Sequence, residues 1–148
     1  MATIITPSDL TVTINESYTL NGVDYGNNIV KVFSNNGRAD QRILNLPTSQ
    51  TKICSFTGND SGGYYQIDSY KYCRFTNLDD TNFIRLGMYN GTDTFWIKLK
   101  AGESFFLMNN DMDAIEGSSL FGSFADITEI NGISDTAACN LEFLVVTS

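Results

Sequence analysis

The sequence predicts an all-β fold, a β-sandwich or jelly roll of about ten short antiparallel strands. Segments with an apolar residue at every second position dominate the chain, and they are rich in Val, Ile, Thr, Tyr and Phe, which suit a half-buried pleated sheet. No window of a dozen residues keeps the apolar spacing of an amphipathic helix. Asn-Gly, the strongest short signal for a hairpin turn, occurs at residues 21–22, 36–37, 90–91 and 131–132.

The expected strands follow these runs in chain order. They are residues 10–20, 28–34, 41–46, 51–56, 64–68, 70–76, 83–89, 94–99, 103–108, 124–130 and 139–147. The long irregular stretch at 109–123 has room for a short helix near Met112 to Glu116.

A chain of 148 residues is the length of one domain, so residues 1–148 are expected to form a single β-sandwich. Within it, residues 1–7 are expected either to extend as an arm toward a neighbour or to fray. The first residues lack the charged and apolar regions of a signal peptide, and no apolar run is long enough to span a bilayer. We therefore expect the protein to be made and used without secretion.

The charge balance excludes several classes of function. Seventeen acidic residues against nine basic ones give a net charge of −8, whereas nucleic acids and anionic membranes need a basic surface. The chain has no histidine, which removes Ser-His-Asp and Cys-His catalysis and His-ligated metals. The composition favours a non-enzymatic scaffold or binding module without a cofactor.

The remaining candidates for chemistry are weak. Cys54, Cys73 and Cys139 are widely spaced without a CxxC pair, so we expect small buried hydrophobic residues. Asp79-Asp80 is expected to cap its own turn rather than to act as a catalytic carboxylate pair.

A calcium loop is also considered and rejected. Asn109, Asp111 and Asp113 resemble the beginning of such a loop, but Ala114 stands where glycine is needed and Leu120 where glutamate is needed. A solvated turn is the better interpretation, and no metal site is predicted.

The middle of the chain predicts a three-stranded meander. A hairpin turn at 77–82 would place 70–76 beside 83–89, and a second turn at 90–93 would place 94–99 on the other side of 83–89. One face is then apolar and is expected to face the core: Cys73, Phe75, Ile84, Leu86, Met88, Phe95, Ile97 and Leu99. The opposite face carries Tyr70, Tyr72, Arg74, Phe83, Arg85, Tyr89, Trp96 and Lys98.

This second face is aromatic and basic on an acidic protein, a composition typical of protein interfaces. The candidate interface residues are Tyr70, Tyr72, Arg74, Phe83, Arg85, Tyr89 and Trp96. The alternative is that a loop or second sheet of the same domain covers the face, with Trp96 over Gly87. Arg74 opposite Arg85 is unfavourable unless an acid from elsewhere pairs with them, and a neighbouring chain is one source of such an acid.

Four segments resemble small virion structural proteins of tailed bacteriophages, notably marine ones. They are LTVTINESYTLNGVDYG at 10–26, YCRFTNLDDTNFIRL at 72–86, FWIKLKAGESFF at 95–106 and DTAACNLEFLVVTS at 135–148. The strings TNLDDTN and DTAACN are unusual and carry most of the likeness. The chain departs from the family at Cys73 and Phe75, where aliphatic residues are usual, which affects packing rather than role.

The resemblance implies a β-sandwich present in many copies on the virion, assembled in the host cytoplasm. The expected function is a head decoration or cement protein, a homotrimer that binds and stabilises the major capsid shell. Such a protein has no nucleic-acid or membrane partner. Two alternatives stay open: a tail, neck or adaptor component of the virion, and a carbohydrate-binding sandwich whose exposed Tyr and Trp stack on sugar rings.

Overall fold

The computed structural model describes residues 5–57, 64–108, 113–114 and 125–148. Its elements in chain order are β1 (Ser8–Glu16), β2 (Thr19–Leu20), β3 (Val23–Asp24), β4 (Asn27–Asn36), β5 (Arg38–Leu46), β6 (Thr51–Thr57), β7 (Tyr65–Gln66), the 3-10 turn η1 (Ile67–Ser69), β8 (Tyr70–Asn77), β9 (Ile84–Tyr89), β10 (Thr94–Leu99), β11 (Ser104–Leu107), β12 (Asp113–Ala114), β13 (Ala125–Asp126), β14 (Glu129–Ser134) and β15 (Cys139–Thr147). The all-β prediction is confirmed. The described part of the chain holds no helix with the length and hydrophobicity to cross a membrane.

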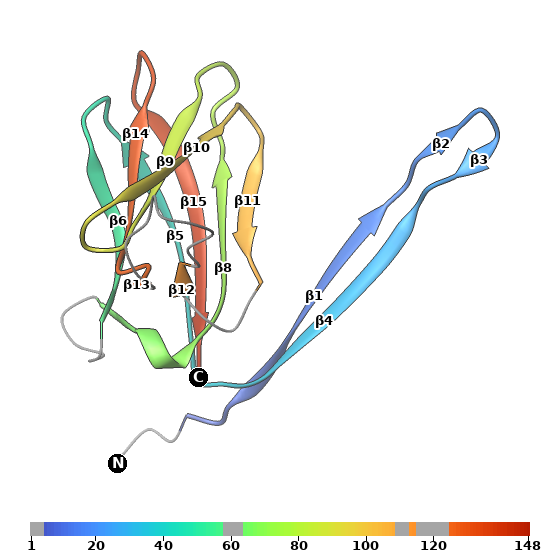
Figure 1. Cartoon of the computed structure of the whole chain (residues 1–148), viewed down its shortest axis with the longest axis horizontal. Coiled ribbons are helices and arrows are strands. Elements are labelled where there is room, and N and C mark those ends of the chain that lie inside the picture. The colour runs from blue at the N-terminus through green and yellow to red at the C-terminus, as the bar shows by residue number, and fades with distance from the viewer. Residues whose placement is uncertain (1–4, 58–63, 109–112, 115–124) are drawn as a thin grey trace.

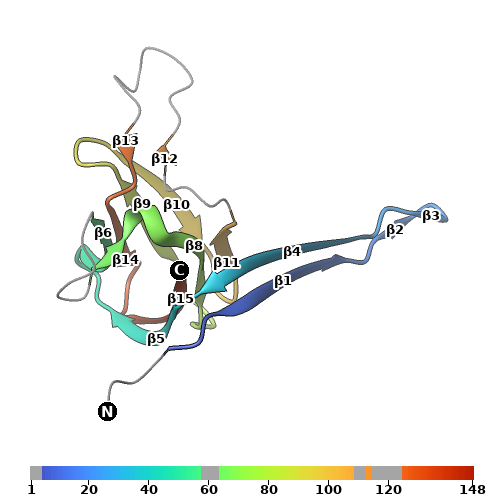
Figure 2. The same cartoon turned by 90° about the horizontal axis from the view of Figure 1, so that it is seen from below.

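Two sheets pack face to face (Figures 1 and 2). Sheet I has the order β10-β9-β14-β6-β7, and sheet II has the order β11-β8-β15-β5. Neighbouring strands are antiparallel except for β7, which lies parallel to β6. With β7 and the separate β12–β13 pair set aside, the strands from β5 to β15 are distributed between the two sheets in the order of a jelly roll, with the first strand beside the last in sheet II.

The core fills the space between the sheets. Its largest fully buried side chains include Phe56, Tyr70 and Phe75, and the ring of Phe75 stacks on Phe143 with centroids 6.4 Å apart. Ile84 and Leu86 of sheet I are fully buried against these residues. Burying side chains of this size stabilises the fold by roughly 1.5–3 kcal/mol each relative to exposure.

The predicted hairpin between 70–76 and 83–89 is wrong, because β8 and β9 belong to different sheets. The connection crosses from sheet II to sheet I, and the buried Asn77 holds it in place. The Asn77 side-chain amide donates to the carbonyl oxygens of Asn82 (2.9 Å) and Leu99 (3.2 Å), and its Oδ1 accepts from the Asp79 N–H. The Asp79 carboxylate in turn accepts the N–H groups of Thr81 and Asn82, so the predicted self-capping by aspartate is confirmed.

Most of the residues predicted to face the core still do so despite this error, because the inner faces of the two sheets face each other. Cys73 and Phe75 point inward from sheet II, while Ile84, Leu86, Met88 and Leu99 point inward from sheet I. The β9–β10 hairpin also has the predicted register, with Met88 opposite Phe95 and Ile84 opposite Leu99. Phe95 was placed in the core incorrectly: it is 60% exposed, because β10 is the edge strand of sheet I.

Two of the four Asn-Gly pairs form the expected turns. Asn21 and Gly22 both have positive φ (52° and 80°) between β2 and β3, and Asn90-Gly91 lies in the turn between β9 and β10. The pair at 36–37 instead joins β4 to β5. The pair at 131–132 lies inside β14, where a Cβ on Gly132 would approach side-chain atoms of Leu46 and Ile53 to 2.6 and 2.9 Å. Gly132 is therefore required by packing, not by a turn.

A long β-hairpin projects from the sandwich and was not predicted as such. We call it the arm, residues 8–36; β1 pairs with β4 along most of their length, and β2 with β3 at the tip. Figures 1 and 2 show it running away from the two sheets. Both alternatives for residues 1–7, an extended arm and a frayed end, stay predictions: residues 5–7 are exposed and outside any strand, and residues 1–4 lie outside the described residues.

The helix expected near Met112 to Glu116 is absent at the two residues of that range that the structure describes. Asp113 and Ala114 form β12 and pair with β13, and the rest of that range lies outside the described residues. The proposed start of a calcium loop at Asn109 and Asp111 also lies outside them.

Candidate protein interface

The seven candidate interface residues do not share a face. Tyr70, Tyr72 and Arg74 belong to β8 in sheet II, whereas Phe83, Arg85, Tyr89 and Trp96 belong to β9, β10 or the residue before β9 in sheet I. Side chains that point outward from the two sheets face opposite sides of the sandwich. The single aromatic and basic face was an artefact of pairing β8 with β9.

Tyr70 and Tyr72 are both buried within their own chain. Tyr70 is 1% exposed, meets the ring of Phe56 edge-on, and donates its hydroxyl to the Leu107 carbonyl oxygen at 2.9 Å. Tyr72 is 5% exposed and lies under Phe33 of the arm, with ring centroids 6.0 Å apart. Neither side chain is available to another molecule, so both are removed from the candidate interface.

The acid that pairs with Arg74 belongs to the same chain. It forms an ion pair with Glu142 on the neighbouring strand β15, and it also donates to Thr76 at 3.2 Å. Arg74 does not lie opposite Arg85, so the predicted like-charge pair between them is wrong.

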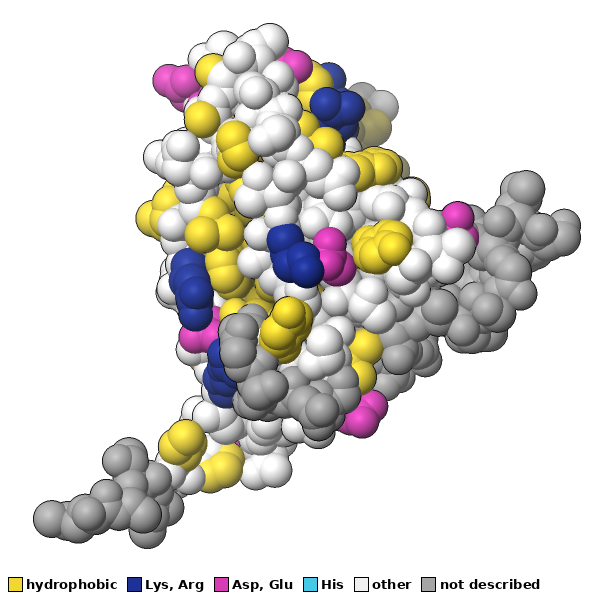
Figure 3. Space-filling model, turned by 90° about the vertical axis from the view of Figure 1, so that its left-hand side faces the viewer, with side chains coloured by type: hydrophobic (Ala, Val, Ile, Leu, Met, Phe, Trp, Pro, Cys, Tyr) yellow, Lys and Arg dark blue, Asp and Glu magenta, His cyan; other side chains and the backbone are white. Residues whose placement is uncertain are grey.

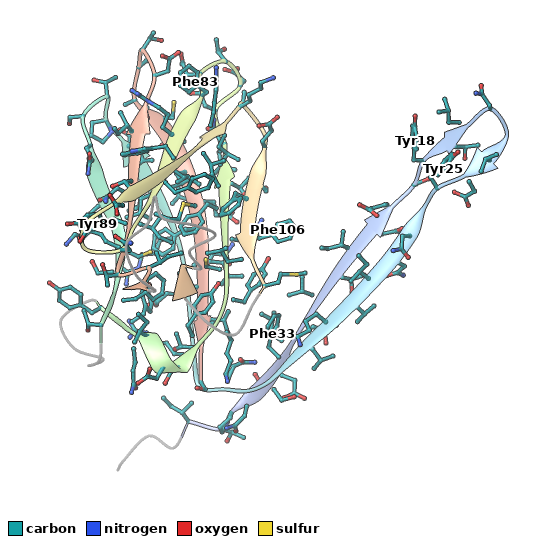
Figure 4. The ribbon with its side chains drawn as sticks, in the orientation of Figure 1. Tyr18, Tyr25, Phe33, Phe83, Tyr89 and Phe106 are labelled. Atoms are coloured by element: carbon teal, nitrogen blue, oxygen red, sulfur yellow. The ribbon has the colours of Figure 1, made fainter. Side chains whose placement is uncertain are left out.

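The remaining candidates form one surface on the outside of sheet I. We call it the basic face: Phe83, Arg85, Tyr89, Trp96 and Lys98. Trp96 lies over Gly87, since a Cβ on Gly87 would approach Trp96 ring carbons to 2.8 and 2.9 Å. The predicted Trp96–Gly87 contact is thus present, although it leaves Trp96 38% exposed. Phe83 and Tyr89 lie toward the two ends of this surface (Figure 4).

The like-charge pair in this region is Lys98 and Arg85. These two residues are directly opposite each other on β10 and β9, and both are exposed. Lys98 Nζ lies 3.9 Å from the centroid of the Phe83 ring, a cation–π contact. Among the described residues, no acid forms an ion pair with either cation. Cations placed directly across a strand pair repel each other, so this surface favours an acidic partner.

The arm is the surface that the sequence analysis missed. Seven of its large apolar side chains are 44–58% exposed: Tyr18, Leu20, Val23, Tyr25, Ile29, Val30 and Val32. A two-stranded hairpin without further packing is marginally stable in water. Exposed apolar residues gathered on one element mark an interaction site more often than scattered ones do. An indicator was available in the Asn21-Gly22 hairpin flanked by alternating apolar residues, but alternation does not show whether another sheet covers either face.

The root of the arm is anchored on the outer face of sheet II. Phe33 is 2% exposed and packs with Tyr72 and Val146, with Leu10 and Val12 of β1 beside them. Asn36 ties the two arm strands together by donating to the carbonyl oxygens of Ser8 (2.9 Å) and Phe33 (2.7 Å). Figure 4 shows Phe33 at this root and Tyr18 and Tyr25 at the far end.

The three cysteines behave as predicted, as small buried residues without disulfides. Burial raises the pKa of the Cys54 thiol well above its ordinary value and that of Cys73 to about 12. These thiols remain protonated near neutral pH, so they are poor nucleophiles and metal ligands. The described residues contain no cluster of three or more Cys, Asp or Glu suited to a metal ion.

A groove lies beside the arm root, lined by residues from the N-terminal segment, β1, β5 and β15. Its basic group, Arg38, forms an ion pair with Asp40 at 2.9 Å and stacks on Tyr65 with the guanidinium carbon 4.7 Å from the ring centroid.

On the side of the molecule seen in Figure 3, basic and acidic side chains are interspersed rather than gathered by sign.

Comparison of the chain with protein-family models, curated proteins and solved structures gives no match. The arm and the basic face are therefore interpreted from their own chemistry.

Proposed function

We propose that the protein is a non-enzymatic structural protein of a bacteriophage virion, a head decoration protein that binds and stabilises the major capsid shell. The observation that carries this proposal is the arm: a projecting hairpin whose exposed apolar residues are not covered by any of the residues that the structure describes. Such an element gains stability when another protein covers it, because its apolar surface then leaves water.

The rest of the molecule suits such a role. The jelly roll is a rigid scaffold that holds the arm on one side and the basic face on the other, so one copy can contact two neighbours. A weak contact repeated over a shell gains effective concentration, and modest affinity at each site is then sufficient. The net charge of −8 favours solubility of a protein displayed at high density. The resemblance of residues 72–86 and 135–148 to virion structural proteins points the same way.

A tail, neck or adaptor component is the alternative within the virion, and it would use the same surfaces. Copy number separates the two, since decoration of a shell needs hundreds of copies and a tail component only a few.

A carbohydrate-binding module is the alternative of a different class. Trp96 favours it, because the ring lies over Gly87 and remains 38% exposed, and an exposed aromatic ring can stack on a sugar ring. A glycan array separates this alternative from decoration, which requires no glycan.

The proposal is tested by sedimenting the full-length protein with phage shells that were assembled in its absence. The wild type is expected to sediment with the shells. Leu20→Asp with Val23→Asp, which places two charges on the apolar tip of the arm, is expected to weaken binding at least tenfold. Leu78→Asp, at an exposed leucine in the turn after β8, is the matched control and is expected to bind as the wild type does. Wild-type protein that stays in the supernatant would contradict the proposal.

A further inference from the structure

The outer part of the arm combines apolar surface with negative charge. Tyr18, Leu20, Val23 and Tyr25 are 48–58% exposed; Leu20 pairs with Val23, and the rings of Tyr18 and Tyr25 lie 6.0 Å apart. Figure 4 shows the two tyrosines together near the tip. The nearby charges are acidic, Glu16 and Asp24, and the first basic residue of the chain is Lys31.

The basic face has the opposite composition. Lys98 and Arg85 lie side by side without an acid from the described residues, and Phe83 and Trp96 supply aromatic surface around them. This surface is suited to a partner that is both apolar and acidic. The protein carries a net charge of −8, and the tip of its arm is both apolar and acidic. The arm of a second copy is therefore such a partner.

The arm does not reach the basic face of its own chain. Its root is held on the outside of sheet II by Phe33, whereas the basic face is on the outside of sheet I. Figures 1 and 2 show the arm extending away from both sheets. We propose that the arm of one copy docks on the basic face of a second copy, with Glu16 and Asp24 near Lys98 and Arg85.

A contact of this kind is head-to-tail, since the two copies use different surfaces. Head-to-tail contacts close into a ring when the rotation between copies allows it. Every copy then gives one arm and receives one.

The size of the contact agrees with assembly into a ring. About eight residues of each arm strand extend beyond the root, so the free hairpin is roughly 26 Å long and 10 Å wide. Covering one side of it removes about 500 Å² from water, counting both partners, which is less than the roughly 1,000 Å² of a stable interface. The two contacts that each copy makes in a closed ring together reach that size, and the ring holds each weak contact in place.

This inference rests on the proposed role in assembly, and charge exchange tests it separately. Sedimentation velocity of the full-length protein over a range of concentrations measures self-association. The arm variant is Glu16→Lys with Asp24→Lys, the face variant is Arg85→Glu with Lys98→Glu, and the third variant combines all four changes. Asp68→Lys reverses an exposed acid in η1 and serves as the control.

The wild type and the Asp68→Lys control are expected to form the same oligomer. The arm variant and the face variant are each expected to associate at least tenfold more weakly, and the combined variant is expected to recover to within about threefold, because its charges are again opposite. Trp96, the one tryptophan of the chain, gives a second measurement: its emission should shift to the blue as the wild type associates.

A wild type that remains monomeric at all concentrations would overturn the inference, as would a combined variant that associates no better than its parents. A monomer that still binds shells would overturn the inference and leave the proposed function standing. A charge-paired oligomer that binds no shell would support the inference and contradict the proposed function.

Discussion

Phe33 of the arm lies on Tyr72 of the sandwich, with ring centroids 6.0 Å apart, and this contact decides where the arm begins. Both rings are almost fully buried, although they come from strands that do not pair with each other. Beyond Phe33, the residues of β4 toward the tip are all exposed. The arm is therefore fixed at its root and free along the rest of its length.

The first prediction concerns this root. Phe33→Ala should remove up to about 3 kcal/mol of packing and release the arm, while the sandwich remains folded. Hydrogen exchange measures this as loss of amide protection in β1 and β4 with protection retained in β8 and β15. Val30→Ala, at an exposed position on the same strand, should change stability by less than about 0.5 kcal/mol. Unchanged protection of β4 in Phe33→Ala would contradict the assigned root.

The second prediction concerns Asn77, which joins the two sheets. Its side-chain amide donates to the Leu99 carbonyl oxygen in sheet I, so Asn77→Ala leaves buried polar groups without a partner. The free energy of unfolding should fall by about 3 kcal/mol, which denaturant titration measures. Asn45→Ala removes an exposed hydrogen bond to Asn140 of 3.0 Å and is the matched control, with an effect expected below about 1 kcal/mol. Equal effects of the two changes would show that Asn77 has no special role.

The third prediction concerns Gly87. A Cβ there would meet the Trp96 ring at 2.8 Å and the Thr94 methyl group at 2.9 Å, so Gly87→Ala must displace Trp96. We expect a loss of about 1–3 kcal/mol in stability and a red shift of the Trp96 emission. Gly37→Ala is the control, since its Cβ would meet its nearest neighbour at 3.4 Å, an ordinary contact. A variant with unchanged emission would contradict the placement of Trp96.

The fourth prediction concerns alkaline pH. Burial raises the pKa of Cys73 to about 12 and that of Cys54 well above its ordinary value of 9.0, so in the folded state both stay protonated when an unfolded thiol ionises. The contribution of each thiol to stability is complete below pH 9.0 and falls as the pH rises above it; for Cys73 it is lost as the pH approaches 12. The free energy of unfolding should fall by about 1.4 kcal/mol per pH unit for each thiol in that range.

Denaturant titrations between pH 8 and 11 measure this slope. Cys54→Ala should be less stable than the wild type at pH 8 and should show a smaller slope above about pH 9. An identical slope in the variant would contradict the burial of that thiol.

The sequence predicted strands well because their residues alternate between two environments. The expected strands at 51–56, 70–76, 94–99 and 139–147 agree with β6, β8, β10 and β15 to within one residue. The inward-facing parity was right for the same reason, since alternation sets the face of each residue regardless of its neighbour.

Strand pairing could not be predicted from the same pattern. Asn77–Asn82 was interpreted as a hairpin turn, and its asparagine and aspartate residues do form a tight turn. What the pattern does not show is that the Asn77 amide reaches Leu99 in the other sheet, which makes the turn a crossing between sheets. The error joined Tyr72 and Trp96 into one face, although they lie on opposite sides of the sandwich.

The arm was missed because alternation predicts a strand but not what covers it. Leu10 and Val12 have the pattern of core residues and do pack at the arm root. Val30 and Val32 lie on strand β4 of the same hairpin, and they are 58% and 49% exposed. Only the arrangement of the whole chain shows which alternating apolar residues are covered by another sheet and which remain exposed.

Immunogold labelling of purified phage particles, with antibody raised against this chain, tests directly whether the protein decorates the capsid shell. We expect dense label over the head, in the hundreds of copies that shell decoration requires. Label confined to the tail, or particles without label, would contradict decoration of the capsid shell.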